Sequence, residues 1–294
     1  MRTRAATSGL VLTFLWVLAG FSLKPSAFAD SQLPIEVIED NSFFIEEAYN
    51  QEVGVVQHIF SAQYGTDLGS DPNEEGWTLQ FTQEWPVFSE RHQFSYAIPV
   101  SLMRDGGEQQ YGLSDILLNY RFQLLNETEQ MPAFAPRFSL ILPTGSRNKQ
   151  TGDGVVGYQW NLPFSKVLAP RVASHLNLGL TYLPDVRIPV DDLGGHLSPP
   201  HSLVNYNLGT SVIFALAPRV HFLVEWIGTF EENIGDDGSE EGSFSSLISP
   251  GFRAAVVNRD QLQIVMGAAA PIGLTSAAPD YGVFLYLSVE HNFL

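Results

Sequence analysis

The feature that most constrains the fold of this chain is a strict alternation of apolar and polar residues, repeated in many segments. In residues 77–88, for example, Trp77 and Leu79 alternate with Thr78 and Gln80. Successive side chains of a β-strand point to opposite faces, so this period of two is typical of strands with one apolar face. No segment shows a competing helical period. The sequence therefore predicts an all-β protein.

The predicted strands are joined by connections that are alternately short and long. Short turns fall at 89–91 and 217–218, for instance, whereas long polar loops are predicted at 184–202 and 231–243. This connectivity is typical of an up-and-down antiparallel transmembrane β-barrel with short periplasmic turns and long extracellular loops. The other long loops are predicted near 64–76, 104–111, 144–154 and 271–281. About twelve strands are predicted, at 51–63, 77–88, 92–103, 112–125, 134–143, 155–167, 171–183, 203–216, 219–230, 244–257, 261–270 and 282–293.

Alternation alone does not decide whether the apolar face points inward, as in a soluble exported β-protein, or outward to lipid. Twelve strands in a soluble barrel would enclose a lumen that side chains hardly fill. Bulky aromatic residues also lie near strand ends, where the interfacial girdles of membrane barrels are found. The chain ends on an alternating strand with Phe293 in the penultimate place, which we interpret as a C-terminal assembly signal. The membrane barrel is the favoured interpretation. The aromatic residues in question are Trp77, Trp85, Trp160, Trp226 and Tyr182.

The N-terminus has the three parts of a cleavable secretory signal. Two arginines precede an apolar stretch at 10–23, and Ala27-Phe28-Ala29 ends it with small residues. The stretch is too short for a transmembrane helix. We therefore predict a signal peptide at 1–29, an N-terminal periplasmic or lumen segment at 30–50 and the barrel at 51–294.

The charge of the chain excludes one class of partner. Removal of the signal would leave 12 basic and 32 acidic residues, a formal charge of −20. Nucleic-acid recognition depends on basic patches, so it is not expected. There are no cysteines, and therefore neither disulfides nor thiolate metal sites.

The polar face of the predicted strands carries ionisable residues. As lumen-lining groups they would set which solutes pass. Alternatively, they form a paired network that fills the lumen, because unpaired buried charges are costly. The two roles are compatible, and the sequence leaves both open. The candidates are Glu84, Asp115, Arg121, Arg137, Arg171, His175, His221, Glu225, Arg253 and Glu290.

Motifs for catalysis, cofactors or metals are lacking in the sequence. The acidic loop at 231–241 does not follow the spacing of a calcium-binding EF-hand loop, although binding of a divalent cation there stays open. His196 and His201 have no third ligand at a diagnostic spacing. We therefore expect no enzyme activity, cofactor or metal. A barrel enzyme of the outer-membrane phospholipase type would need a nucleophile beside a histidine on the lipid-facing rim, whereas His175 and His221 lie on the polar face.

Several short motifs occur in an order that resembles an outer-membrane family labelled "MetA-pathway of phenol degradation". They are Gly112-Leu113-Ser114-Asp115-Ile116-Leu117-Leu118-Asn119-Tyr120-Arg121-Phe122, then Leu142-Pro143-Thr144-Gly145, Leu162-Pro163-Phe164-Ser165-Lys166, Leu176-Asn177-Leu178-Gly179 and Glu225. The likeness covers about residues 75–294, but Ser146 stands where the family has an acidic residue. The resemblance implies an outer-membrane barrel that assists uptake of small or aromatic compounds.

These observations predict a channel or uptake protein in the cell outer membrane for passive passage of small solutes. Its expected partners are outer-membrane lipid and lipopolysaccharide, the barrel assembly machinery and an unidentified small-molecule solute. A phospholipase-type enzyme and a plugged barrel with a structural or surface-interaction role are the alternatives. The solute cannot be read from the fold.

Overall fold

The computed structural model describes residues 40–67, 74–105, 108–190, 196–235, 237–259 and 261–293. The predicted signal peptide at 1–29 lies outside the described residues and stays a prediction. Within the described ranges, no helix is long and apolar enough to cross a membrane. The helical element that is described is one short 3₁₀ helix, η1 (Arg147–Lys149), in a loop.

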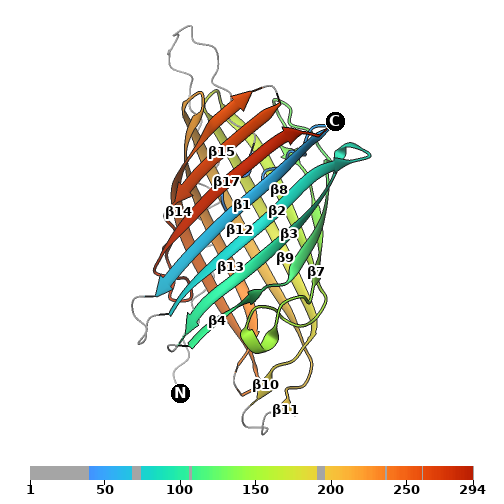
Figure 1. Cartoon of the computed structure of the whole chain (residues 1–294), viewed down its shortest axis with the longest axis vertical. Helices are drawn as coiled ribbons and strands as arrows, with labels where there is room; N and C mark the ends of the chain where they lie inside the picture. The colour runs from blue at the N-terminus through green and yellow to red at the C-terminus, as the bar shows by residue number, and fades with distance from the viewer. Residues whose placement is uncertain are drawn as a thin grey trace. The chain divides into compact units, whose positions relative to one another are not determined.

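The described strands form an antiparallel sheet that closes on itself. β1 (Val55–Asp67) pairs with β17 (Tyr281–Asn292) from Val55 opposite Asn292 to Thr66 opposite Tyr281, and Figure 1 shows these two strands side by side. Three strands of the barrel wall are interrupted, so that β4 with β5, β6 with β7 and β15 with β16 each count as one. The result is a closed barrel of twelve antiparallel strands, as predicted.

The remaining wall strands are β2 (Glu74–Val87), β3 (Ser89–Asp105), β4 (Glu108–Leu113), β5 (Ile116–Phe122), β6 (Ala133–Phe134), β7 (Arg137–Leu142), β8 (Gly157–Ala169), β9 (Val172–Val186), β12 (His201–Ala217), β13 (Val220–Ile234), β14 (Glu240–Arg259), β15 (Leu262–Ala269) and β16 (Ile272–Gly273). A separate two-stranded sheet, β10 (Pro189–Val190) and β11 (His196–Leu197), lies in the loop between β9 and β12. The consecutive wall strands are hairpin neighbours, which is the up-and-down order.

Alternate residues of each strand face opposite sides of the wall. On β2, Leu79 is 42% exposed, whereas the neighbouring inward residues Thr82 and Glu84 are buried. Large apolar side chains are exposed around the outside of the barrel in the same way. Contiguous apolar surface of this extent is what a barrel presents to lipid. The predicted outward direction of the apolar face is therefore confirmed.

The strands differ from the prediction mainly in length. β1 begins at Val55 rather than at residue 51, and residues 51–54 lie before it. The loops predicted at 104–111 and 231–243 consist largely of strand, since β3 reaches Asp105 and β13 reaches Ile234. These extensions consist mainly of polar residues. The alternation that marks a strand in the sequence is therefore lost there.

The two faces of β2 give a direct test of the orientation of the wall. We expect Leu79→Arg to reduce the yield of folded barrel, because a cationic residue on the lipid face near the middle of a strand costs about 2–4 kcal/mol. Gln80→Arg, one residue along the chain, places the same side chain in the polar interior and should fold. The measurement is the fraction of each variant that migrates as the heat-modifiable folded form. Equal yields would contradict the assignment of the faces.

Candidate functional site

Residues 40–51, here called the lumen segment, occupy the interior of the barrel. Asp40, Ser42, Ile45, Glu47 and Ala48 are all buried. The segment has no regular secondary structure of its own. Its backbone polar groups therefore need partners from elsewhere, because burying them unpaired is costly. The inward-facing side chains of the wall supply these partners.

Glu225 on β13 makes the most concentrated of these contacts. One oxygen of its carboxylate, Oε1, accepts hydrogen bonds from the backbone N–H groups of Phe43, Phe44 and Ile45 at 3.0, 2.9 and 3.1 Å. Glu225 thus fixes the turn at 43–45 against one side of the wall.

Other wall strands bind the segment through amide and hydroxyl side chains. Asn177 on β9 accepts from the Glu46 N–H and donates to the Glu46 carbonyl, both at 2.8 Å. Ser165 Oγ on β8 accepts from the Ala48 N–H at 2.7 Å. Gln93 on β3 accepts from the Gln51 N–H at 2.8 Å. Successive residues of the segment are therefore held by strands that are far apart in the sequence.

Two buried arginines satisfy carbonyl groups of the segment. Arg121 on β5 donates to the Glu47 carbonyl at 3.1 Å and also to the Tyr49 carbonyl and the Asn50 side chain. Arg253 on β14 donates to the Asp40 carbonyl at 2.7 Å. These guanidinium groups bind the segment near its two ends, because one contacts residues 47–50 and the other contacts Asp40.

An apolar cluster holds the segment on one side of the lumen. Phe43 packs against Phe284 and Tyr286 of β17, with ring centroids 5.4 and 5.7 Å apart. Ile213 and Leu223 are fully buried in the same cluster. The interior is therefore not uniformly polar. The alternation in the sequence had suggested a polar interior throughout. The other members are Ile59, Ala255, Val265 and Ala269, with Phe44 partly buried against it.

The structure brings most of the predicted lumen residues to the interior. Glu84, Arg121, His175, His221, Glu225 and Arg253 are buried on inward faces, and Arg137 is nearly so. Glu290 lies two residues after the inward-facing Ser288 on β17, on the same face, and is half-buried. Their effect on solute selection stays a prediction. Two residues of the predicted set are placed differently.

Arg171 is not buried in the interior, unlike most of the other predicted lumen residues. It lies in the turn between β8 and β9 and is exposed. The strand β9 begins at Val172 and not at residue 171 as predicted, so Arg171 belongs to the turn.

Asp115 lies between β4 and β5 and holds the loop at 143–156. Its carboxylate accepts from the Gly145 N–H at 2.8 Å and from the Asp153 N–H at 2.9 Å. A Cβ atom on Gly152 would come within 2.3 Å of Asp115 Oδ1, so a larger residue there would displace this carboxylate. Burial, followed by repulsion from Asp115, raises the pKa of Asp153. Asp115 is thus an anchor for the loop that carries η1.

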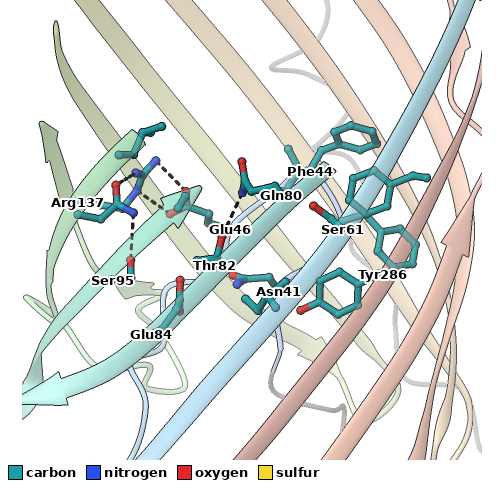
Figure 2. A pocket seen from close by; sticks show the side chains of 17 residues that line it. Asn41, Phe44, Glu46, Ser61, Gln80, Thr82, Glu84, Ser95, Arg137 and Tyr286 are labelled. Atoms are coloured by element: carbon teal, nitrogen blue, oxygen red, sulfur yellow. Dashed lines mark hydrogen bonds and ion pairs between the residues drawn. The ribbon is translucent and has the colours of Figure 1, made fainter. Parts of the chain in front are cut away.

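A cavity of about 270 Å³ separates the lumen segment from the opposite side of the wall. Figure 2 shows Arg137 and Glu46 at one side of it and Phe44 and Tyr286 at the other. The Arg137 guanidinium and the Glu46 carboxylate are paired at 2.8 Å. The cavity therefore has a charged, hydrogen-bonding side and an aromatic side. Its other lining residues are Asn41, Phe43, Ile45, Ile59, Ser61, Gln80, Thr82, Glu84, Ser95, Ala97, Leu117, Asn119 and Phe284.

A second set of contacts fastens the segment where it nears the short-turn end of the barrel. The Tyr49 hydroxyl donates to Glu127, which lies in the connection between β5 and β6. Glu127 also pairs with Lys166 at 3.0 Å and accepts from the Val167 N–H at 2.9 Å. Burial acts to raise the pKa of Glu127, but the hydrogen bonds from Tyr49, Lys166 and Val167 outweigh it and hold this pKa below 4.5.

A serine and a histidine lie in contact, as a phospholipase-type enzyme would require, but both are buried in the interior of the barrel. Ser165 Oγ is 2.6 Å from His175 Nδ1, and both side chains are buried inside the barrel. The Ala48 N–H occupies the serine oxygen at 2.7 Å. A phospholipase-type site needs such a pair at the lipid-facing rim, where a substrate can reach it. Ser165 and His175 therefore act here as part of the support for the lumen segment.

The sequence motifs considered for metals lie at the long-loop end. His201 Nδ1 is 2.8 Å from Glu240 Oε1, and Glu232 accepts from the Val204 N–H at 2.7 Å. Among the described residues, no group of three or more His, Asp or Glu side chains is arranged to hold a metal ion. The side chain of His196 lies outside the described part of the chain.

Phe293 follows the last residue of β17 and is 49% exposed. Its N–H donates to the Gly54 carbonyl at 2.8 Å, which continues the pairing of the two chain ends beyond the strands. Its role as an assembly signal stays a prediction.

Comparison with known proteins supports the fold. Neither the protein-family models nor the curated proteins include a match to this chain. Among solved structures, an outer membrane channel from Pseudomonas putida F1 has a TM-score of 0.60 at 14% identity, over 84% of this chain and 98% of that one. At this identity the likeness concerns the barrel fold.

Two further solved structures are similar at lower scores. The NanC porin has a TM-score of 0.47 at 6% identity, over 81% of this chain and 100% of that one. The translocator domain of the autotransporter NalP from Neisseria meningitidis has a TM-score of 0.48 at 9% identity, over 83% and 90% of the two chains.

Loss of the Glu225 carboxylate should release the turn of the lumen segment. Glu225→Ala leaves three N–H donors without their acceptor, and an unsatisfied buried group costs about 1–3 kcal/mol. We expect unfolding in urea at a lower concentration and faster protease cleavage within residues 40–51. Glu231→Ala, on an exposed position of the same strand, is the control and should behave as the unchanged protein. Equal cleavage of both variants would show that Glu225 does not hold the segment.

The contacts of Glu127 should make stability depend on pH. Because the folded pKa lies below the ordinary value of 4.5, the ionised Glu127 stabilises the folded state above pH 4.5, and this contribution is lost as the pH falls through the folded pKa. We expect Glu127→Gln to lower the melting temperature at about pH 6 and to have little effect at about pH 3. Glu129→Gln, on an exposed residue of the same connection, is the control. A constant difference between Glu127→Gln and the unchanged protein across this range would contradict the proposed contribution.

Proposed function

We propose that this chain is an outer-membrane channel through which small solutes pass beside the lumen segment. The single observation that carries this proposal is the cavity between residues 41–46 and the strands β1, β2, β3, β5, β7 and β17. The closed barrel, with a fold similar to that of an outer membrane channel, supports it. Location in the outer membrane, with a cleaved signal at 1–29, is part of the proposal.

The lining of the cavity favours small amphipathic solutes. Polar groups of Gln80, Thr82 and Asn119 line one side, and the rings of Phe44 and Phe284 line the other. An apolar cavity of about 150 Å³ accommodates one benzene ring, so a cavity of about 270 Å³ has room for one ring with polar substituents. The sequence resemblance to a family associated with phenol degradation is compatible with such solutes. Membership of that family is part of this proposal.

The lumen segment explains why such a channel would be selective. A barrel of twelve strands with an empty interior would pass solutes largely by size. Here the segment is fixed by Glu225, Arg121 and Arg253 and leaves free space on one side. Passage is therefore restricted to solutes that tolerate a narrow space with one aromatic and one polar side.

Recording of single channels in a planar bilayer tests the proposal. We expect the unchanged protein to conduct and Thr82→Trp to reduce its conductance several-fold, because Thr82 is buried and lines the cavity. Gln83→Trp places the same side chain on the outward face of β2 and should leave conductance unchanged.

Two results would argue against a channel of this form. Equal conductance of Thr82→Trp and Gln83→Trp would show that ions do not pass through this cavity. A protein that conducts only after Glu225→Ala would favour a plugged barrel with a structural or surface-interaction role.

A further inference from the structure

Two histidines meet across the seam where the barrel closes. His58 is the fourth residue of β1, and His291 is the next-to-last residue of β17. Their Nε2 atoms are 3.3 Å apart, and the rings are stacked with centroids 5.3 Å apart. The pair lies on the outward side, because Gln57 and Ile59, which flank His58, are buried inward-facing residues. It is near the short-turn end of the strands and not at their middle.

The hydrogen bonding of His291 orients its free nitrogen toward His58. Its Nδ1 is 2.9 Å from the Asn292 carbonyl oxygen, which can only accept a hydrogen bond. Nδ1 therefore carries the proton, and Nε2 of the neutral ring presents a lone pair at His58. A ligating histidine typically donates its other N–H to a carbonyl or carboxylate in this way, which fixes the tautomer.

The separation of the two nitrogens matches a shared metal ion. Zinc binds histidine nitrogen at about 2.0–2.1 Å, and two such bonds at the tetrahedral angle place their nitrogens about 3.3–3.4 Å apart. An N–H···O hydrogen bond is usually shorter, near 2.9–3.0 Å. The observed 3.3 Å is long for a hydrogen bond between the two rings and equals the separation expected for two nitrogens that share an ion.

The surroundings of the pair favour a borderline metal over a hard cation. Gln83 lies opposite His58, and Val56 and Leu262 lie opposite His291, in the strand register. Phe81 stacks on the His58 ring at 6.2 Å. Glu290, the neighbouring carboxylate in the chain, alternates to the inward face. Imidazole without carboxylate suits zinc, copper or nickel and does not suit calcium or magnesium.

We propose that His58 and His291 form a binding site for a divalent transition-metal ion, which fastens the first strand of the barrel to the last. The described residues offer no third histidine or carboxylate, so water completes the coordination. The site is separate from the lumen and does not depend on the channel function. A bound ion stabilises the closed barrel by mass action, because it binds only where the two strands are paired.

The site is tested by measuring the temperature at which the untagged chain loses its folded form in detergent. The measurement is made once with ZnCl₂ and once with EDTA. We expect zinc to raise the transition by a few degrees in the unchanged protein. His58→Gln should abolish the rise. His92→Gln is the control, because His92 lies on β3 and is bonded to the Tyr120 hydroxyl at 2.6 Å instead of to a second histidine. MgCl₂ should give no rise.

The proposal is overturned if zinc does not raise the transition temperature of the unchanged protein, or if it raises that of His58→Gln by the same amount. It is also overturned if magnesium raises the transition temperature as zinc does, through the acidic loops. Should His58→Gln fail to fold, electron paramagnetic resonance of the unchanged protein with one equivalent of Cu²⁺ decides the question. Coupling of the Cu²⁺ ion to two imidazole nitrogens is expected in the unchanged protein and in His92→Gln. Coupling to fewer than two imidazole nitrogens in the unchanged protein would refute the site.

Discussion

The structure depends on one constraint, which is that backbone hydrogen-bonding groups facing lipid cannot be satisfied by water. An open sheet edge is therefore excluded in a bilayer, and the first and last strands must pair. The antiparallel pairing of β1 with β17 along nearly the whole of both strands meets this requirement. Closure of twelve strands then creates an interior too wide for the wall's own side chains to fill. The remaining features of the molecule are responses to that interior.

The lumen segment transfers the same problem to the inside of the barrel. A peptide without regular structure has unpaired N–H and C=O groups, and here they are buried. Glu225 pairs three consecutive N–H groups, Asn177 pairs both groups of Glu46, and Arg121 pairs carbonyls. Polar inward residues that would be costly in an empty dry space become the partners of a peptide. This explains why charged residues of both signs recur on the inner face.

The strands of the barrel wall could be predicted from the sequence, but the residues and contacts that fill its interior could not. Lipid on one side imposes a period of two, so the strands were predictable. Ile213 and Leu223 were not recognisable as interior residues, because their neighbours Phe214 and Phe222 make both faces apolar. The contacts of the lumen segment also escaped prediction. Phe43 and Glu225 are 182 residues apart in the chain, and no local pattern encodes such a pairing.

The asymmetry of the anchoring determines where free space can exist. Residues 42–46 are bound by Ser211, Glu225 and Asn177 on neighbouring strands β12, β13 and β9. The turn is therefore drawn against that side, and the space opens next to β1, β2 and β3. Glu46 reaches across to Arg137, where it bounds the cavity with a charged pair. Anchoring of residues 42–46 on β9, β12 and β13 therefore leaves a cavity that has one charged, hydrogen-bonding side and one aromatic side.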